Sequence, residues 1–123
     1  MTKELTAAVD AARQALDQRP LIQSKIDEAQ QELRELAGEV EAAKVRLGDA
    51  EADASLGGDG KAASTARKAL ASVRESVETV EARLAGLRAR LARLDSEISD
   101  VHSELRRASY AEGQAEIRKW RSG

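Results

Sequence analysis

Apolar side chains recur along the second half of the chain in an unbroken alternation of three and four residues. The set runs Ala63, Ala66, Leu70, Val73, Val77, Val80, Leu84, Leu87, Leu91, Leu94, Ile98, Val101, Leu105 and Ala108. Such an alternation, with arginine and glutamate between the apolar positions, is typical of a helix that packs along one stripe in a coiled coil. It predicts a helix over residues 61–121.

The first half follows the same rule and predicts a helix over residues 3–55. Its set runs Leu5, Ala8, Ala12, Ala15, Arg19, Ile22, Ile26, Ala29, Leu33, Leu36, Val40, Ala43, Leu47, Ala50 and Ala54. We call the two sets together the seam. Only Arg19 is charged, and Pro20 follows it. Because a proline removes one helical hydrogen bond while the seam keeps its phase, we expect a kink near Pro20 and no change of direction. Whether the segment before it is a separate helix stays open.

Residues 56–60 predict a tight turn, since each glycine costs about 1 kcal/mol in a helix interior. Gly57 suits the left-handed position that closes a helix, and Asp59 suits the N-cap of the next one. So short a turn makes the helices antiparallel neighbours. The expected fold is all-α: a single long antiparallel coiled-coil helical hairpin that dimerises into a four-helix bundle.

Composition narrows the class of protein further. Aromatic residues make up 2% of the chain and charged residues 34%, which is typical of long helices and not of a compact aromatic core. Cysteine is absent, which excludes disulfides and thiolate metal sites. No signal sequence or membrane span is expected. We therefore expect a cytoplasmic protein, or one inside a virion assembled there.

Candidate chemistry is sparse. The single histidine, His102, lies beside the seam on a helix without an expected pocket, so a surface role is favoured over a catalytic one. Gly57–Lys61 lacks the spacing of a phosphate-binding loop. We expect no enzymatic activity, no metal and no cofactor. The net charge of −2 does not favour nucleic acid as a partner.

Two sets of residues predict protein contacts. Val9, Leu16 and Leu21 lie beside the seam and predict an oligomer face or a site for a partner helix. Alternatively, the alanines near them are helix formers on a solvated face. At the other end of the chain, Tyr110, Ile117 and Trp120 are roughly helically spaced, and Arg118 and Arg121 lie among them. They predict docking to an unidentified protein or capping of the bundle, and less strongly stacking on nucleic acid.

Acids gather where the hairpin should turn: Asp49, Glu51, Asp53 and Asp59. In outline this tip resembles the bacterial transcription factors that insert a coiled-coil finger into the secondary channel of RNA polymerase. That resemblance implies tip carboxylates acting on the catalytic magnesium, with Asp53 and Asp59 as the first positions to test. We expect this chain to depart from the family, because three glycines loosen the tip and the hairpin leaves none of these 123 residues over for a globular domain.

The sequence thus favours a non-enzymatic coiled-coil assembly, scaffold or adaptor protein that forms a homodimer and binds a partner protein. Many small coiled-coil proteins of bacteria and phages have this character. The alternatives are a regulatory finger acting on RNA polymerase, and a nucleic-acid-associated helical protein that uses its basic C-terminal end.

Overall fold

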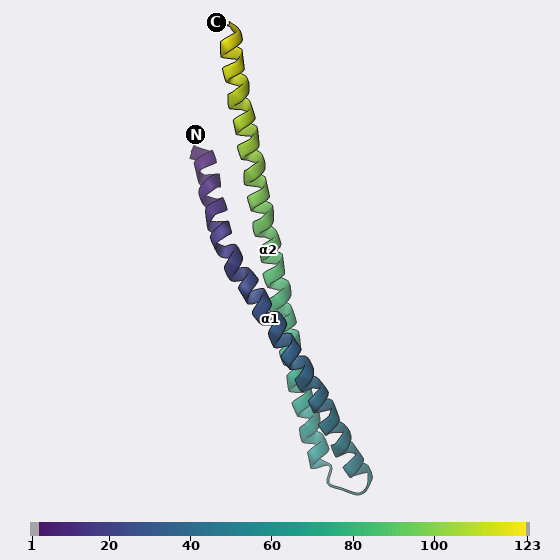
Figure 1. The fold of residues 1–123 in the computed structure, drawn as a ribbon. Coiled ribbons are helices and arrows are strands. Elements are labelled where there is room, and N and C mark those ends of the chain that lie inside the picture. Colours follow the sequence, from purple (N-terminus) through teal and green to yellow (C-terminus); the bar gives the residue numbers. More distant parts are fainter. Residues whose placement is uncertain (1–2, 123) are drawn as a thin grey trace. The chain divides into compact units, whose positions relative to one another are not determined.

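Two long helices make up the protein. The computed structural model describes the backbone of residues 3–122 and the side chains of residues 3–111 and 114. Helix α1 spans Lys3–Ser55 and helix α2 spans Lys61–Ser122 (Figure 1). No strand occurs within residues 3–122. The prediction of an all-α helical hairpin is confirmed.

Helix α1 ends in a pair of nested hydrogen bonds. The Gly58 N–H donates to the Asp53 carbonyl at 2.8 Å, and the Gly57 N–H donates to the Ala54 carbonyl at 3.2 Å. Gly57 has a φ of 95°, so it occupies the left-handed region as predicted. This combination is the Schellman motif, which satisfies carbonyls that the end of a helix otherwise leaves without donors. The glycines therefore stop α1 with a defined geometry.

Helix α2 begins at an aspartate cap. The Lys61 N–H donates to Oδ1 of Asp59 at 3.0 Å, and the Ser64 N–H donates to the Gly60 carbonyl at 3.1 Å. Lys61 is the first residue of α2, and the Asp59 side chain satisfies its backbone N–H, which has no acceptor within the helix. Asp59 therefore caps the start of α2 with its side chain, as the sequence predicts, although the carbonyl that accepts the first helical hydrogen bond is that of Gly60.

Pro20 lies inside α1, and the helix is continuous on both sides of it. Because proline has no N–H, the carbonyl of Leu16 loses its usual helical donor at this point. The segment before Pro20 is therefore part of α1 and not a separate helix.

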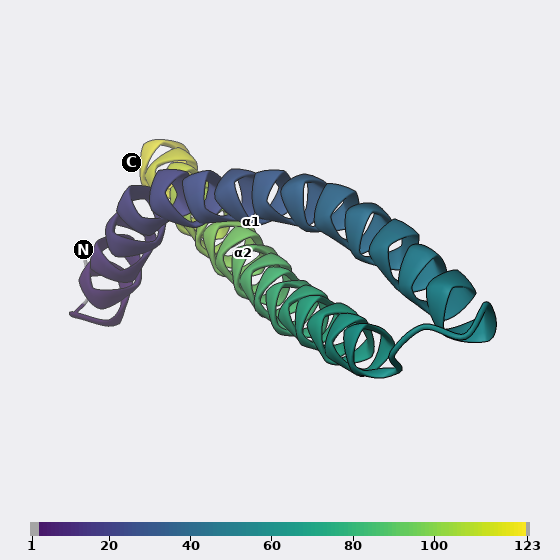
Figure 2. The same ribbon diagram turned by 90° about the horizontal axis from the view of Figure 1, so that it is seen from below.

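Contacts divide the chain into two compact units. The turn unit is Ser24–Arg88, and it holds the end of α1, the turn and the start of α2. The terminal unit combines the part of the chain up to Gln23 with the part from Ala89 onward. Figure 2 shows the helical segments and the turn from a second direction.

Candidate interaction surfaces

The seam positions are the ones that become covered. Every apolar seam residue is buried or half-buried. The fully buried ones are Ala15, Ile22, Ile26, Ala29, Ala43, Ala63, Leu70, Val80, Leu84 and Leu94. The three-and-four spacing therefore identified the contact stripe of each helix correctly. The remaining seam leucines and valines, including Leu33, Val40 and Val77, are only half-buried.

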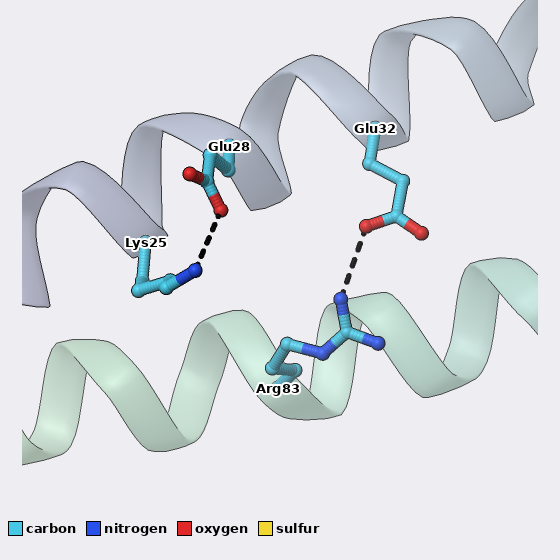
Figure 3. A network of polar contacts seen from close by, with 4 residues as sticks. All are labelled: Lys25, Glu28, Glu32 and Arg83. Atoms are coloured by element: carbon cyan, nitrogen blue, oxygen red, sulfur yellow. Dashed lines mark hydrogen bonds and ion pairs between the residues drawn. The ribbon is translucent and has the colours of Figure 1, made fainter.

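Two ion pairs join the helices within the turn unit. Nη1 of Arg83 lies 3.0 Å from Oε2 of Glu32 on the facing helix, whereas Lys25 and Glu28 pair within α1 (Figure 3). Closer to the turn, Nε of Arg67 donates to Oε1 of Glu51 at 2.9 Å. These side chains are about half exposed, so each pair adds little free energy of folding. Their value is that they mark which residues of α1 and α2 lie at the same level.

Arg19, the one charged residue of the seam, has a partner on α2 within the terminal unit. Nε of Arg19 donates to Oδ1 of Asp95 on α2 at 2.8 Å. This hydrogen bond, together with the negative charge of Asp95, raises the pKa of Arg19 above its ordinary value. The arginine side chain is half exposed, so it reaches out of the seam toward the carboxylate. A polar residue at a single seam position is a known way to fix the register of paired helices.

Two of the four acids at the predicted tip have structural partners. Glu51 pairs with Arg67, and Asp59 caps α2. Asp49 and Asp53 are exposed, and no ion pair holds either within the described part of the chain. The structure therefore divides the cluster, and only Asp49 and Asp53 keep carboxylates that are available to a ligand.

Only part of the predicted C-terminal surface can be placed. Tyr110 is 70% exposed. The side chains of Ile117, Arg118, Trp120 and Arg121 lie outside the described residues. His102 is exposed on α2, and its Nε2 lies 3.2 Å from Nη2 of Arg106.

The predicted oligomer face is not one continuous stripe. Val9 is half-buried, whereas Leu16 and Leu21 are 53% and 61% exposed. Val9 and Leu16 are seven residues apart and share one side of α1. Leu21 follows Leu16 by five residues, which turns it by about 140° around the helix axis. Leu21 therefore faces another direction, and only Val9 and Leu16 can contribute to one contact.

Shallow grooves lie on two sides of the seam in the turn unit, and an ion pair between the helices crosses each side: Glu51–Arg67 on one and Glu32–Arg83 on the other. One edge carries two shallow grooves in succession. The first groove is lined by Leu33, Ala37, Val40, Glu41, Val77 and Glu81. The second is lined by Leu47, Arg67, Leu70, Ala71, Arg74, Glu75 and Glu78. Arg67, Arg74 and Glu81 are seven residues apart, so they form one row along α2 that borders both grooves. We call this side the apolar edge.

The opposite side, which we call the polar edge, is lined by Glu32, Ser72, Glu75, Ser76, Thr79, Val80 and Arg83. The Ser76 hydroxyl donates to the Ser72 carbonyl, and the Thr79 hydroxyl donates to the Glu75 carbonyl. The Ser76 and Thr79 hydroxyl groups thus have acceptors in their own helix, and Glu32 and Arg83 pair with each other across the helices. Sequence reasoning did not separate the two edges, because it had no fixed register from which to assign neighbours across the helices.

Metal ligation and membrane insertion can each be checked over the described residues. Among these residues, no group of three or more His, Cys, Asp or Glu side chains is placed to hold a metal ion. Neither helix, over the same residues, has a stretch apolar enough to cross a bilayer. Comparison of the chain with protein families, curated proteins and solved structures found no match.

Proposed function

We propose that this protein is a non-enzymatic coiled-coil assembly or adaptor protein that self-associates and binds a partner protein. The half-buried seam carries this proposal. Two helices cover Leu33, Val40 and Val77 only in part, and Leu16 stays 53% exposed. Burial of apolar area stabilises a contact by about 25 cal/mol per Å², so a further helical layer over these side chains would be favourable. A two-helix structure with grooves that open to solvent offers surfaces more readily than a catalytic cleft.

Self-association is tested by sedimentation or light scattering of the full chain over a range of concentrations. We expect a species with twice the 13.2 kDa mass of the chain, whose fraction grows with concentration. A chain that stays monomeric up to the highest soluble concentration would refute self-association.

Partner binding is proposed for the C-terminal end, where Tyr110 is exposed. Tryptophan, tyrosine and arginine are enriched at binding hot spots, and this end of the sequence holds all three types. The test is affinity capture from the native host with the Trp120→Ala variant. The control is Leu56→Ala, which changes a residue that is 87% exposed at the turn. We expect a partner that is lost with Trp120→Ala and kept with Leu56→Ala; a partner kept with both would place the contact elsewhere.

The polymerase finger is a second candidate, supported by the two exposed acids Asp49 and Asp53. They are better targets than Asp59, because replacing Asp59 would also remove the cap of α2. The test is reversal of both charges in a transcription assay, and an unchanged assay would remove this candidate. For the nucleic-acid alternative, absence of DNA and RNA binding at low salt is the corresponding refutation.

A further inference from the structure

We infer that the first part of α1, residues 3–19, is a strap that opens from α2 as one unit, with its hinge at Pro20, while the rest of α1 stays paired. Opening of the strap does not require self-association, so this motion and the proposed function can fail separately. Three features of the terminal unit support the motion: the small seam residues of the strap, the large ones that it covers on α2, and the proline at its end.

The seam of the strap consists mainly of small residues. Its five seam positions are Leu5, Ala8, Ala12, Ala15 and Arg19. Of these five, only Ala15 is buried. The next five seam positions of α1 are Ile22, Ile26, Ala29, Leu33 and Leu36, and the first three of them are buried. Because burial of apolar area holds the helices together, each turn of the strap is attached to α2 more weakly than the turns of α1 that follow it.

The part of α2 that faces the strap carries larger apolar residues than the strap covers. Arg19 pairs with Asp95 and the helices form a hairpin, so the strap lies against the seam residues of α2 that follow Asp95. Three of these seam residues, Ile98, Val101 and Leu105, are only half-buried. Opening of the strap would uncover this apolar stripe of α2, and it would give up less buried area than opening of the turns beyond Pro20.

Pro20 places a weak point at the end of the strap. Because proline has no N–H, the carbonyl of Leu16 lacks its helical donor there, and fewer hydrogen bonds oppose a bend. The ion pair between Arg19 and Asp95 lies next to this point, but both side chains are about half exposed, so the pair holds the strap only weakly. Pro20 is the one proline of the chain, so α2 has no corresponding weak point. The bend therefore falls in α1, at Pro20.

Hydrogen exchange of the unmodified full chain tests the motion directly. Amides of an element that opens as a unit share one free energy of opening, which is lower than the free energy of global unfolding. We expect similar protection for the amides of residues 8–18, and a step to protection at least about tenfold higher after Pro20. Protection that rises gradually along α1, or that is equal on both sides of Pro20, would overturn the strap.

Thiol labelling of two matched variants gives a second measurement. The chain has no cysteine, and Ala15 and Ala29 are both buried seam residues of α1. Ala15→Cys lies in the strap and Ala29→Cys lies beyond the hinge, and a buried thiol reacts only when its surroundings open. Relative to its rate in denaturant, Ala15→Cys should react at least about tenfold faster than Ala29→Cys. Equal relative rates would mean that the two positions open together, which would overturn the strap.

Two further substitutions distinguish the strap from other ways of opening. Gly58→Ala disturbs the closure of α1 at the turn, so it should speed labelling of Ala29→Cys about tenfold, or about 1.4 kcal/mol, and leave labelling of Ala15→Cys unchanged. If both rates rose alike, the helices would open as one unit; if neither rose, they would separate gradually, and either result overturns the strap. Pro20→Ala restores the helical donor and should slow labelling of Ala15→Cys about tenfold, whereas an unchanged rate would overturn the hinge at Pro20.

Discussion

Gly58→Ala is the sharpest test of how α1 is closed. A Cβ built on Gly58 would lie 2.7 Å from the carbonyl oxygen of Asp53 and 3.1 Å from its carbonyl carbon. The obstacle is backbone and not the movable end of a side chain, so the last turn of α1 has to shift. That shift breaks the hydrogen bond from the Gly58 N–H to the same oxygen.

The expected cost has two parts. Losing one hydrogen bond costs about 0.5–1.5 kcal/mol. The close contact adds to it until the last turn unwinds, so the total should reach about 1–3 kcal/mol, a range usual for a substitution that breaks a special backbone arrangement. The assay is urea unfolding followed by the helical circular dichroism signal. All variants must be compared at one protein concentration, because association shifts apparent stability.

The matched control is the same substitution two residues later. A Cβ on Gly60 would meet nothing within 4 Å. Gly60→Ala should therefore stabilise the protein by about 0.4–1 kcal/mol, because alanine restricts the unfolded chain more than glycine does. If Gly58→Ala were as stable as the wild type, or if Gly60→Ala lost as much stability as Gly58→Ala, the proposed role of the Schellman closure would be wrong.

The remaining predictions concern single positions, each measured by the same unfolding assay. Gly86→Ala should raise stability by roughly 0.5–1 kcal/mol, because Gly86 lies inside α2 with open space around it; a loss would mean an unseen neighbour. Asp59→Ala should cost about 1 kcal/mol and Asp59→Asn much less, since asparagine also caps helices; equal losses would argue against capping. Ala29→Leu should cost about 1–3 kcal/mol, because Ala29 is 1% exposed and the seam has no room for three more carbons; a neutral result would indicate a loose seam. Asp95 raises the pKa of Arg19, so the ion pair contributes its stability below the unfolded pKa of arginine and loses it only as pH rises through the higher folded value. The stability difference between wild type and Arg19→Ala should therefore stay constant from neutral to mildly alkaline pH, and a steady decline there would contradict this account.

Much of the fold could be predicted from local patterns. The alternation of three and four residues depends only on helix geometry, so it identified the buried stripe, including Ala29 and Leu84, without knowledge of tertiary structure. The roles of Gly57 and Asp59 at the helix ends could also be predicted. A left-handed helix closure and a side-chain cap each depend on the properties of a single residue.

The interaction surfaces were less accessible to sequence reasoning. Whether Glu51 is free or paired depends on Arg67 across the helices, and a slip by one turn would pair it differently. The apolar edge likewise exists only once the register brings Ala37 and Val40 beside Val77. Leu21 was grouped with Leu16 because both lie beside the seam, although five residues turn a helix by about 140° and set the two on different sides of it. Contacts between helices therefore need a fixed register, which single-helix patterns do not supply.

The ladder of cross-helix ion pairs also has a kinetic consequence. Glu51 and Arg67 are 16 residues apart in the chain, Glu32 and Arg83 are 51 apart, and Arg19 and Asp95 are 76 apart. Closing the longest of these loops first would cost about 1.4 kcal/mol more entropy than closing the shortest. Pairing of the two helices should therefore begin next to the glycine turn during folding and proceed away from it. The segments around Arg19 and Asp95 would pair after those nearer the turn and would separate before them, which makes them more open to exchange with another molecule.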